Sequence, residues 1–149
     1  MNDTLDKTKT RALKILGHRN FSEQEMIKRL TSKGESQEDS EDAVAWLVEL
    51  GYINDENYAM LIVEHYSTKG YGMSRIKDEL YKRGIPRDLW DSAFSSLDDE
   101  STSEAALIFL RKKLRGSTDE NDVRKARDAL VRRGFSFDDA KAAINLYLE

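Results

Sequence analysis

The feature that most restricts the fold is an internal repeat of fifty residues. Leu30, Leu80 and Leu130 each stand four residues before a glycine, and the surrounding apolar positions recur with the same shift. The glycines are Gly34, Gly84 and Gly134, and the other matched sets are Met26/Ile76/Ala126, Ala43/Ala93/Ala143, Val44/Phe94/Ile144 and Leu47/Leu97/Tyr147. A unit of this length buries little core by itself, so neighbouring copies must pack against one another. The sequence therefore predicts three copies of one supersecondary unit, the third with a longer loop near Gly116.

Within each copy the apolar residues have helical spacing. Met26 and Leu30 lie four positions apart, and no segment alternates every second residue as a strand does. Ser22 to Glu25 has the form of a capping box, and the recurring glycines suit the left-handed position that ends a helix. Pro86 can begin the helix that follows Gly84. We predict nine helices, near residues 8–18, 22–33, 38–50, 55–68, 73–83, 86–96, 102–115, 122–133 and 136–148.

The predicted fold class is all-α, with three tandem three-helix repeats in an elongated, curved array. The expected repeats are residues 1–53, 54–100 and 101–149. Their breaks are placed near Asn54 and in the polar run 96–103, where Asp98 to Glu100 are interpreted as a solvated linker rather than a metal site. Asp55 and Asp122 are expected to cap the helices that they precede. The glycines of residues 70–72 are interpreted as a flexible joint between two helices.

The composition excludes several kinds of function. The 149 residues include no Cys, which excludes disulfides, thiolate metal sites and a cysteine nucleophile. His18 and His65 have no partner at the spacing of a triad or a metal motif, and there is no phosphate-binding GxxxxGK[ST] loop. We therefore expect no enzyme, no cofactor and no metal. No apolar run approaches the ~18 residues of a membrane span, and the N-terminus lacks a signal peptide's apolar stretch, so we expect a cytoplasmic protein without membrane contact.

The charge of the chain is arranged in alternating blocks. The net charge is −4, yet residues 69–90 carry +3 and residues 105–133 carry +5, whereas residues 35–68 carry −9. Lys33, Arg83 and Arg133 directly precede the helix-ending glycines, where one cation complements the helix dipole. At two of these positions a second cation comes directly before the first, as Lys82-Arg83 and Arg132-Arg133, although one cation is enough to complement the dipole. The pattern fits either a solvated surface or a basic track that contacts a polyanion or an acidic protein surface.

The basic positions proposed for such contacts lie in the second and third repeats. They are Arg75, Lys77, Lys82, Arg83, Arg111, Lys112, Lys113, Arg115, Lys125, Arg127, Arg132 and Arg133, together with the aromatic Tyr71.

The order of these motifs resembles that of the RecX family, bacterial regulators of the recombinase RecA. The first repeat is similar to the family at Arg19 to Met26, and the boundary at Leu50 to Glu56 is similar too. The stretch Lys69 to Ile85 is closest to the family's second-repeat signature, and Arg132 to Phe135 looks like its third-repeat element. The resemblance covers roughly residues 8 to 148.

The resemblance implies binding along the groove of RecA filaments on single-stranded DNA. There the family limits filament extension or promotes disassembly, which restrains recombination and SOS induction. Tyr71, Arg75, Lys77, Lys82 and Arg83 match signature positions, which implies a contact role, whereas the third-repeat cations are proposed from charge alone. The pI near 5.3 favours contacts with the recombinase itself over phosphate contacts, so weak or indirect DNA contact is expected. The chain is also expected to be a monomer.

Two other classes remain open from the sequence. Three-helix units with a glycine turn also describe helix-turn-helix modules, so a DNA-binding regulator is the alternative function. A generic helical scaffold for another partner is the third. Duplex binding that falls steeply with salt would indicate the DNA-binding class, and a scaffold would affect neither DNA nor filament.

Overall fold

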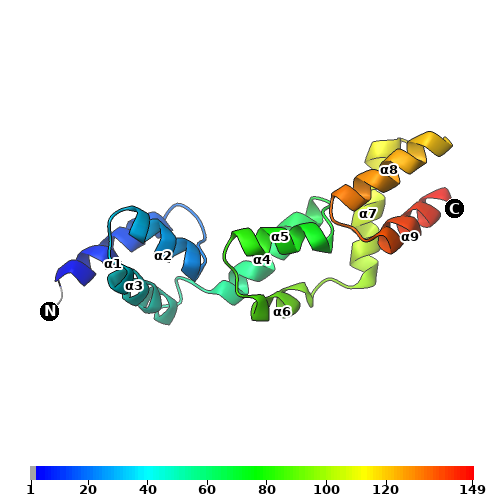
Figure 1. The fold of residues 1–149 in the computed structure, drawn as a ribbon. Coiled ribbons are helices and arrows are strands. Elements are labelled where there is room, and N and C mark those ends of the chain that lie inside the picture. The colour runs from blue at the N-terminus through cyan, green and yellow to red at the C-terminus, as the bar shows by residue number, and fades with distance from the viewer. Residues whose placement is uncertain (1–2) are drawn as a thin grey trace. The chain divides into compact units, whose positions relative to one another are not determined.

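The computed structural model describes residues 3–149, apart from the side chain of Asp99, and this part of the chain is helical without any strand (Figure 1). The elements are α1 (Asp3–Leu16), α2 (Glu23–Ser32), α3 (Gln37–Glu49), α4 (Asp55–Thr68), α5 (Met73–Lys82), the 3₁₀ turn η1 (Arg87–Leu89), α6 (Trp90–Phe94), α7 (Asp99–Leu114), α8 (Glu120–Arg132) and α9 (Phe137–Leu148). The predicted all-α fold class is confirmed.

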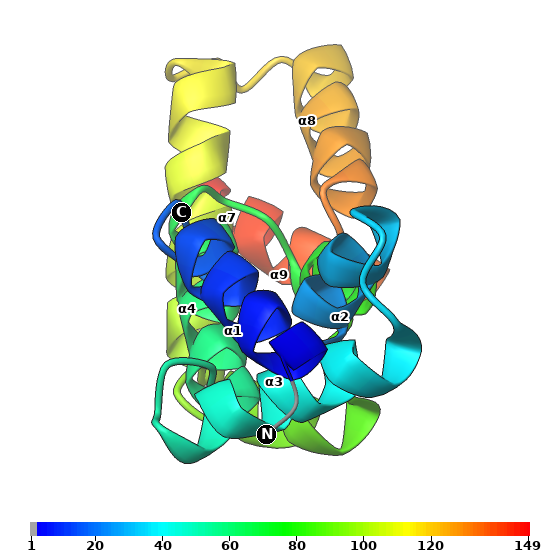
Figure 2. The same ribbon diagram turned by 90° about the vertical axis from the view of Figure 1, so that its left-hand side faces the viewer.

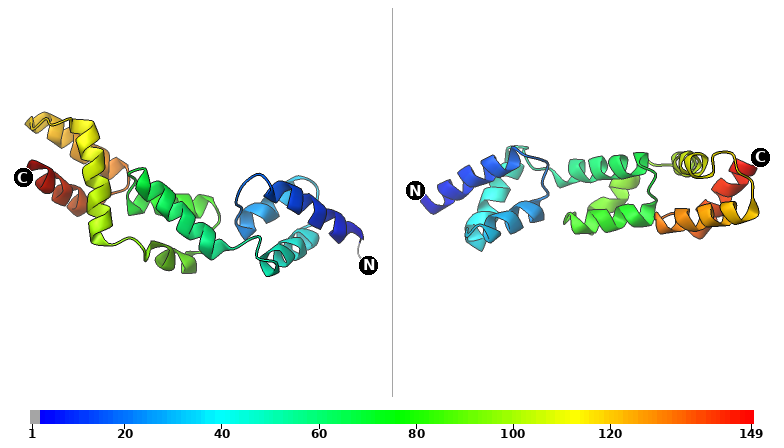
Figure 3. Two further views of the ribbon diagram at one scale, coloured as in Figure 1. Left: turned by 180° about the vertical axis from the view of Figure 1, so that it is seen from behind. Right: turned by 90° about the horizontal axis from the view of Figure 1, so that it is seen from above.

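The chain folds into two compact units. The first holds the described residues up to Ala59 together with Leu80–Trp90, and the second holds Met60–Glu79 together with Asp91–Glu149. In the first unit α3 packs on both α1 and α2, and the three form one group in Figures 1 and 2. In the second unit α7, α8 and α9 pack pairwise, and Figure 3 shows this group from two further sides. The division into repeats at residues 53 and 100 stays a prediction, and its first residues, Met1 and Asn2, lie outside the described part.

Burial follows the fifty-residue repeat. Met26, Leu30, Ala43 and Val44 lie in the core of the first unit. Their third-repeat equivalents form the core of the second unit: Ala126, Leu130, Ala143 and Ile144. The middle-repeat equivalents are buried as well: Ile76, Leu80, Ala93 and Phe94. The predicted repeat is therefore confirmed at these positions. The match weakens at its last position, where Leu47 is fully buried but Leu97 and Tyr147 are only half-buried.

The recurring glycines end their helices by the same hydrogen bonds. Gly34, Gly84 and Gly134 have φ of 99°, 73° and 101°, the left-handed region that favours glycine. In each case the residue after the glycine donates its N–H to the carbonyl of Leu30, Leu80 or Leu130, at 3.0 to 3.1 Å. This is the bond that closes a Schellman motif, so the predicted helix ends are confirmed.

Three predicted helix starts are wrong, and for two of them the structure shows which residue caps the helix instead. The first helix begins at Asp3 rather than near residue 8. Asp99 and Glu100, placed in a linker, instead begin α7, because the Asp98 carboxylate accepts the Ser101 N–H at 2.7 Å and caps the helix. This bond lowers the pKa of Asp98. α8 begins at Glu120, because Asp119 rather than Asp122 accepts the first backbone N–H groups.

The predicted helix over residues 86–96 is shorter than expected. It consists of the 3₁₀ turn η1 and the five residues of α6. Pro86 precedes η1 with an extended ψ of 139°, and the Trp90 indole N–H donates to the Ile85 carbonyl at 3.0 Å. At the far end the Ser95 hydroxyl donates to the Ser92 carbonyl at 2.6 Å, a side-chain bond that competes with helix propagation.

Asp55 caps a different helix from the one that the sequence suggested. Its carboxylate accepts the N–H of Glu23, the first residue of α2, at 2.9 Å. Asn54, one residue earlier, accepts the N–H of Asn57 at 3.0 Å and so serves the start of α4. Burial raises the pKa of Asp55 above its ordinary value of 3.8, despite the bond from Glu23. Burial and the nearby Asp55 carboxylate together raise the pKa of Glu23.

We expect Asp55→Asn to flatten the pH dependence of stability. The pKa values of Glu23 and Asp55 are both raised in the folded chain, so the folded chain holds their protons more tightly than the unfolded chain does. The unfolding free energy therefore falls as pH rises through the folded pKa values. Asparagine keeps an oxygen that can accept the Glu23 N–H but removes the charge. Urea unfolding followed by circular dichroism from about pH 4 to 7 measures the change. An unchanged pH slope would assign the effect to other groups.

Within residues 3–149, no helix is long and apolar enough to cross a membrane.

Candidate functional site

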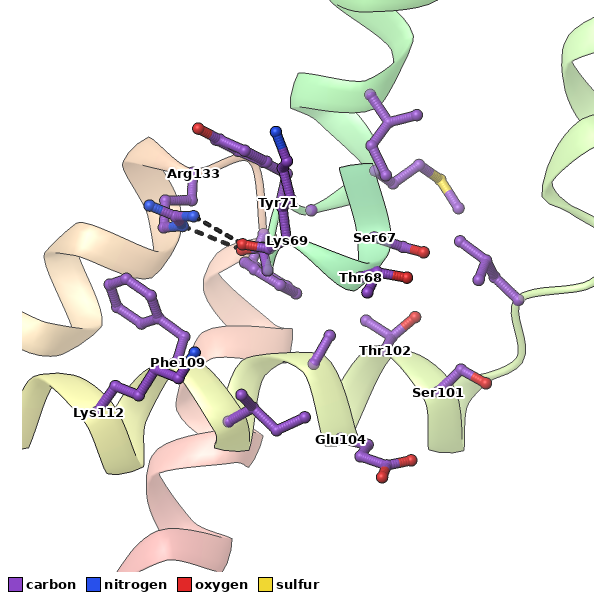
Figure 4. Close-up of a pocket in the computed structure, with 18 of the residues that line it drawn as sticks. Ser67, Thr68, Lys69, Tyr71, Ser101, Thr102, Glu104, Phe109, Lys112 and Arg133 are labelled. Carbon is purple, nitrogen blue, oxygen red and sulfur yellow. Dashed lines mark hydrogen bonds between the residues drawn. The ribbon is translucent and has the colours of Figure 1, made fainter. Parts of the chain in front are cut away.

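In the second unit, Arg133 holds the loop between α4 and α5 against the turn between α8 and α9. Its Nε donates to the Gly70 carbonyl at 3.0 Å and its Nη2 to the Lys69 carbonyl at 2.9 Å (Figure 4). The guanidinium carbon also lies 4.3 Å from the ring centre of Tyr71 and 4.8 Å from that of Phe109. Arg133, one of the doubled cations, therefore has a structural role inside the second unit, which the charge pattern of the sequence did not reveal.

The two backbones meet directly beside this arginine. The Gly72 N–H donates to the Arg133 carbonyl at 2.8 Å and the Ser74 N–H donates to the Gly134 carbonyl at 3.1 Å. A Cβ on Gly72 would lie 2.3 Å from the nitrogen of Phe135, and one on Gly134 would lie 2.4 Å from the nitrogen of Arg75. The interpretation of residues 70–72 as a flexible joint is therefore wrong. Gly72 is needed because two backbones approach closely at this point.

An equivalent contact lies fifty residues earlier, within the first unit. The Ser22 hydroxyl donates to the Arg83 carbonyl, as Gly72 does to Arg133. A Cβ on Gly84 would lie 2.8 Å from the Cβ of Gln24. Arg83 also donates through Nη1 to the Tyr58 hydroxyl at 2.8 Å. Burial raises the pKa of this tyrosine, although the Arg83 bond opposes the rise.

The sequence held a signal for these two contacts. Small residues recur at Ser22 and Gly72, and an Arg-Gly pair recurs at Arg83-Gly84 and Arg133-Gly134. Both features recur after fifty residues, but the repeat does not say that Ser22 contacts Arg83 or that Gly72 contacts Arg133. The tertiary structure supplies that pairing.

A groove of about 940 Å³ lies beside the Arg133 contact, between the α4–α5 loop and α7 (Figure 4). Its apolar lining includes Met73 and Ile108, whose side chains are 49% and 44% exposed although both are hydrophobic. The remaining apolar lining is Ile76, Leu97, Ala105, Phe109 and Phe135, and the polar lining includes Ser67, Thr68, Lys69, Tyr71, Ser101, Thr102, Glu104, Lys112, Lys113 and Arg133. An apolar lining with polar groups among it is the usual form of a binding groove.

The proposed contact residues fall into two groups by exposure. The exposed ones are Lys77, Lys82, Arg111, Lys112, Lys113, Arg115, Lys125 and Arg132. The half-buried ones are Tyr71, Arg75, Arg83, Arg127 and Arg133. Arg75 lies over the ring of Tyr71 at 5.6 Å, and Arg127 lies over that of Phe137 at 5.6 Å and pairs with Asp128 at 3.5 Å. The structure therefore brings Tyr71, Arg75 and Arg133 together, next to the groove that Lys112 and Lys113 line.

Comparison with known families gives two matches. Residues 9–47 match the model of the first three-helix domain of RecX, and residues 54–93 match that of its second three-helix domain.

Individual relatives cover most of the chain. The protein named Regulatory protein RecX in Xanthomonas axonopodis pv. citri (strain 306) is 32% identical, and the match covers 93% of this chain and 86% of that protein. The protein of the same name in Stenotrophomonas maltophilia (strain R551-3) is 33% identical, and the match covers 89% of this chain and 82% of that protein. The crystal structure of RecX from Lactobacillus salivarius has the same fold, with a TM-score of 0.89 at 24% identity over 99% of this chain and 98% of that one.

Proposed function

The chain belongs to the RecX family of regulatory proteins, and from this premise we propose that it is a mainly negative modulator of RecA activity. In this proposal it binds RecA filaments on single-stranded DNA in the filament groove. There it blocks extension or promotes disassembly, and so restrains recombination and SOS induction. It acts in the cytoplasm as a monomer, by steric and electrostatic competition and without catalysis.

The observation that carries the proposal is the family match over most of the chain, and the surface chemistry supports it. Eight of the proposed basic residues are exposed, while the net charge of the chain is −4. A protein with local basic patches and an acidic average is better suited to acidic patches on a protein partner than to DNA of uniform negative charge. Contact with single-stranded DNA is accordingly weak or indirect.

The exposed residues are the ones to which we assign partner contacts. Arg83 and Arg133 contribute indirectly, because each holds two segments of its own unit together. Tyr71 and Arg75 lie beside Arg133, at the edge of the groove.

The decisive experiment is a titration of the protein into the single-stranded-DNA-dependent ATPase of its cognate RecA. Loss of ATPase at protein levels too low to coat the DNA is the expected result. A DNA-only binding assay runs beside it. Tight, salt-sensitive DNA binding without any effect on RecA would favour the DNA-binding regulator instead.

The basic cluster that ends α7 is expected to contribute strongly to inhibition. Replacing Arg111, Lys112, Lys113 and Arg115 by Gln removes four exposed positive charges near one another. We expect the concentration for half-inhibition to rise by about tenfold or more, with a weaker dependence on salt. The matched control replaces Lys7, Lys14, Lys28 and Arg29, four exposed cations of the first unit, by Gln. Equal losses in both variants would indicate a response to net charge alone.

A further inference from the structure

The groove of the second unit has the features of a docking site for one kind of segment. We propose that it receives an amphipathic α-helix of the filament protein, with apolar residues on one face and acidic residues beside them. This proposal rests on the proposed function and adds to it the place and chemistry of one contact.

Apolar exposure is the first observation. Ile108 of α7 and Met73 of α5 both line the groove, and they are 44% and 49% exposed. Further apolar side chains line the groove with them, among them Phe109 and Phe135. Covering these side chains would remove apolar surface from water, which favours association.

The spacing of the lining residues on α7 favours a helix as the occupant. Along α7 the lining residues Ala105, Ile108, Phe109 and Lys112 stand at the spacing of one helix face. This face spans about two turns, roughly 10 Å, which suits apolar residues on two successive turns of a second helix. Residues 3–149 contain no strand, so they offer no sheet edge to which an extended peptide could add.

The charged residues of the groove indicate which sign of charge its occupant carries. Lys112 and Lys113 line it toward the C-terminal end of α7, and Lys69 lines it from the α4–α5 loop. Toward the N-terminal end of α7 the lining changes to the hydroxyls of Ser101 and Thr102, with Glu104. Three lysines against one carboxylate favour an acidic segment, and the lysines would meet its acidic side chains.

The groove is also held open before anything binds. Arg133 fixes the α4–α5 loop through the Lys69 and Gly70 carbonyls and packs against Phe109 of α7. A preformed wall of this kind reduces the ordering cost of binding.

Site-specific crosslinking tests the proposal in the full chain. Ile108 is replaced by the photocrosslinker p-benzoylphenylalanine, and the protein is irradiated with filaments of its cognate RecA on single-stranded DNA. The matched control carries the same group at Leu146 of α9, which is 42% exposed and does not line the groove. Mass spectrometry then identifies the crosslinked peptides, and co-sedimentation with filaments is measured in parallel.

The expected result is a crosslink from position 108 to one RecA helix that carries acidic residues beside an apolar face, and little from position 146. Co-sedimentation without a crosslink at 108, or a crosslink there to DNA or to a basic segment, would overturn the groove assignment alone. Failure of the unsubstituted protein to co-sediment with filaments would overturn the proposed function, and the groove proposal with it.

A substitution gives an independent readout. Ile108→Glu places a negative charge in the apolar lining, where it would repel the acidic side chains of the proposed occupant. We expect filament affinity to fall by about tenfold or more. Leu146→Glu should change it less than about twofold. Circular dichroism melts establish that both variants fold. Equal affinity of the two variants would contradict the proposal.

Discussion

Gly72→Ala is expected to lower the unfolding free energy by about 3 kcal/mol or more, although it adds a single methyl group. The new Cβ would lie 2.3 Å from the Phe135 nitrogen and 2.4 Å from the Gly134 carbonyl carbon. Both atoms belong to backbone, which cannot rotate away as a side chain does. The two backbones must then move apart, which should break the 2.8 Å hydrogen bond from the Gly72 N–H to the Arg133 carbonyl. Urea unfolding followed by circular dichroism measures the difference.

Gly116→Ala is the control that separates crowding from backbone conformation. Gly116 has φ of +87° and nothing within 4 Å of its added Cβ, so alanine there should cost only the left-handed penalty of about 1–2 kcal/mol. Gly72 does not have a positive φ, so its whole loss comes from crowding. A Gly72→Ala variant no less stable than Gly116→Ala would mean that the two backbones do not meet in solution.

Arg133→Ala and Arg132→Ala are expected to differ sharply, although the two arginines are neighbours. Arg133 donates to two carbonyls and packs on two aromatic rings, so its loss should cost about 2–4 kcal/mol of unfolding free energy. Arg132 is exposed, and its loss should change stability by less than about 0.5 kcal/mol. Thermal and urea unfolding of both variants measures this contrast.

The same pair should separate in function. Arg132→Ala is expected to weaken inhibition of RecA while the fold stays intact, because its side chain faces solvent and can reach a partner. An equally small loss of stability in both variants would show that the Arg133 contacts contribute little. In that case the doubled cations would be one surface feature, as their sequence spacing alone suggests.

Much of the fold could be predicted because it depends on short-range chemistry. A helix is defined by contacts three and four residues apart, so Met26 and Leu30 reveal a buried face without knowledge of the rest. The capping box at Ser22 and the glycine after α8 are also local, and both are confirmed. The resemblance to the RecX family, read from Lys69 to Ile85 above all, is confirmed by the family comparisons.

The errors arose where two local solutions competed. Asp119 and Asp122 are both good caps, and the choice of Asp119 depends on which backbone N–H groups it reaches. Asp55 stands at the start of α4, but its carboxylate bonds to Glu23, more than thirty residues earlier in the chain. No spacing rule along one helix predicts such a partner.

Sequence patterns were enough to predict that this chain is helical, repeats every fifty residues and ends its helices at glycine, because these properties follow from hydrogen bonds and side chains within a few residues. The same patterns identified the family. Three features became visible only in the folded chain: Arg133 points inward while Arg132 stays exposed, Gly72 meets Gly134, and a groove opens beside Ile108. Neighbouring arginines have the same local chemistry. Their roles diverge because helix packing brings the Lys69 and Gly70 carbonyls within reach of one and leaves the other in water.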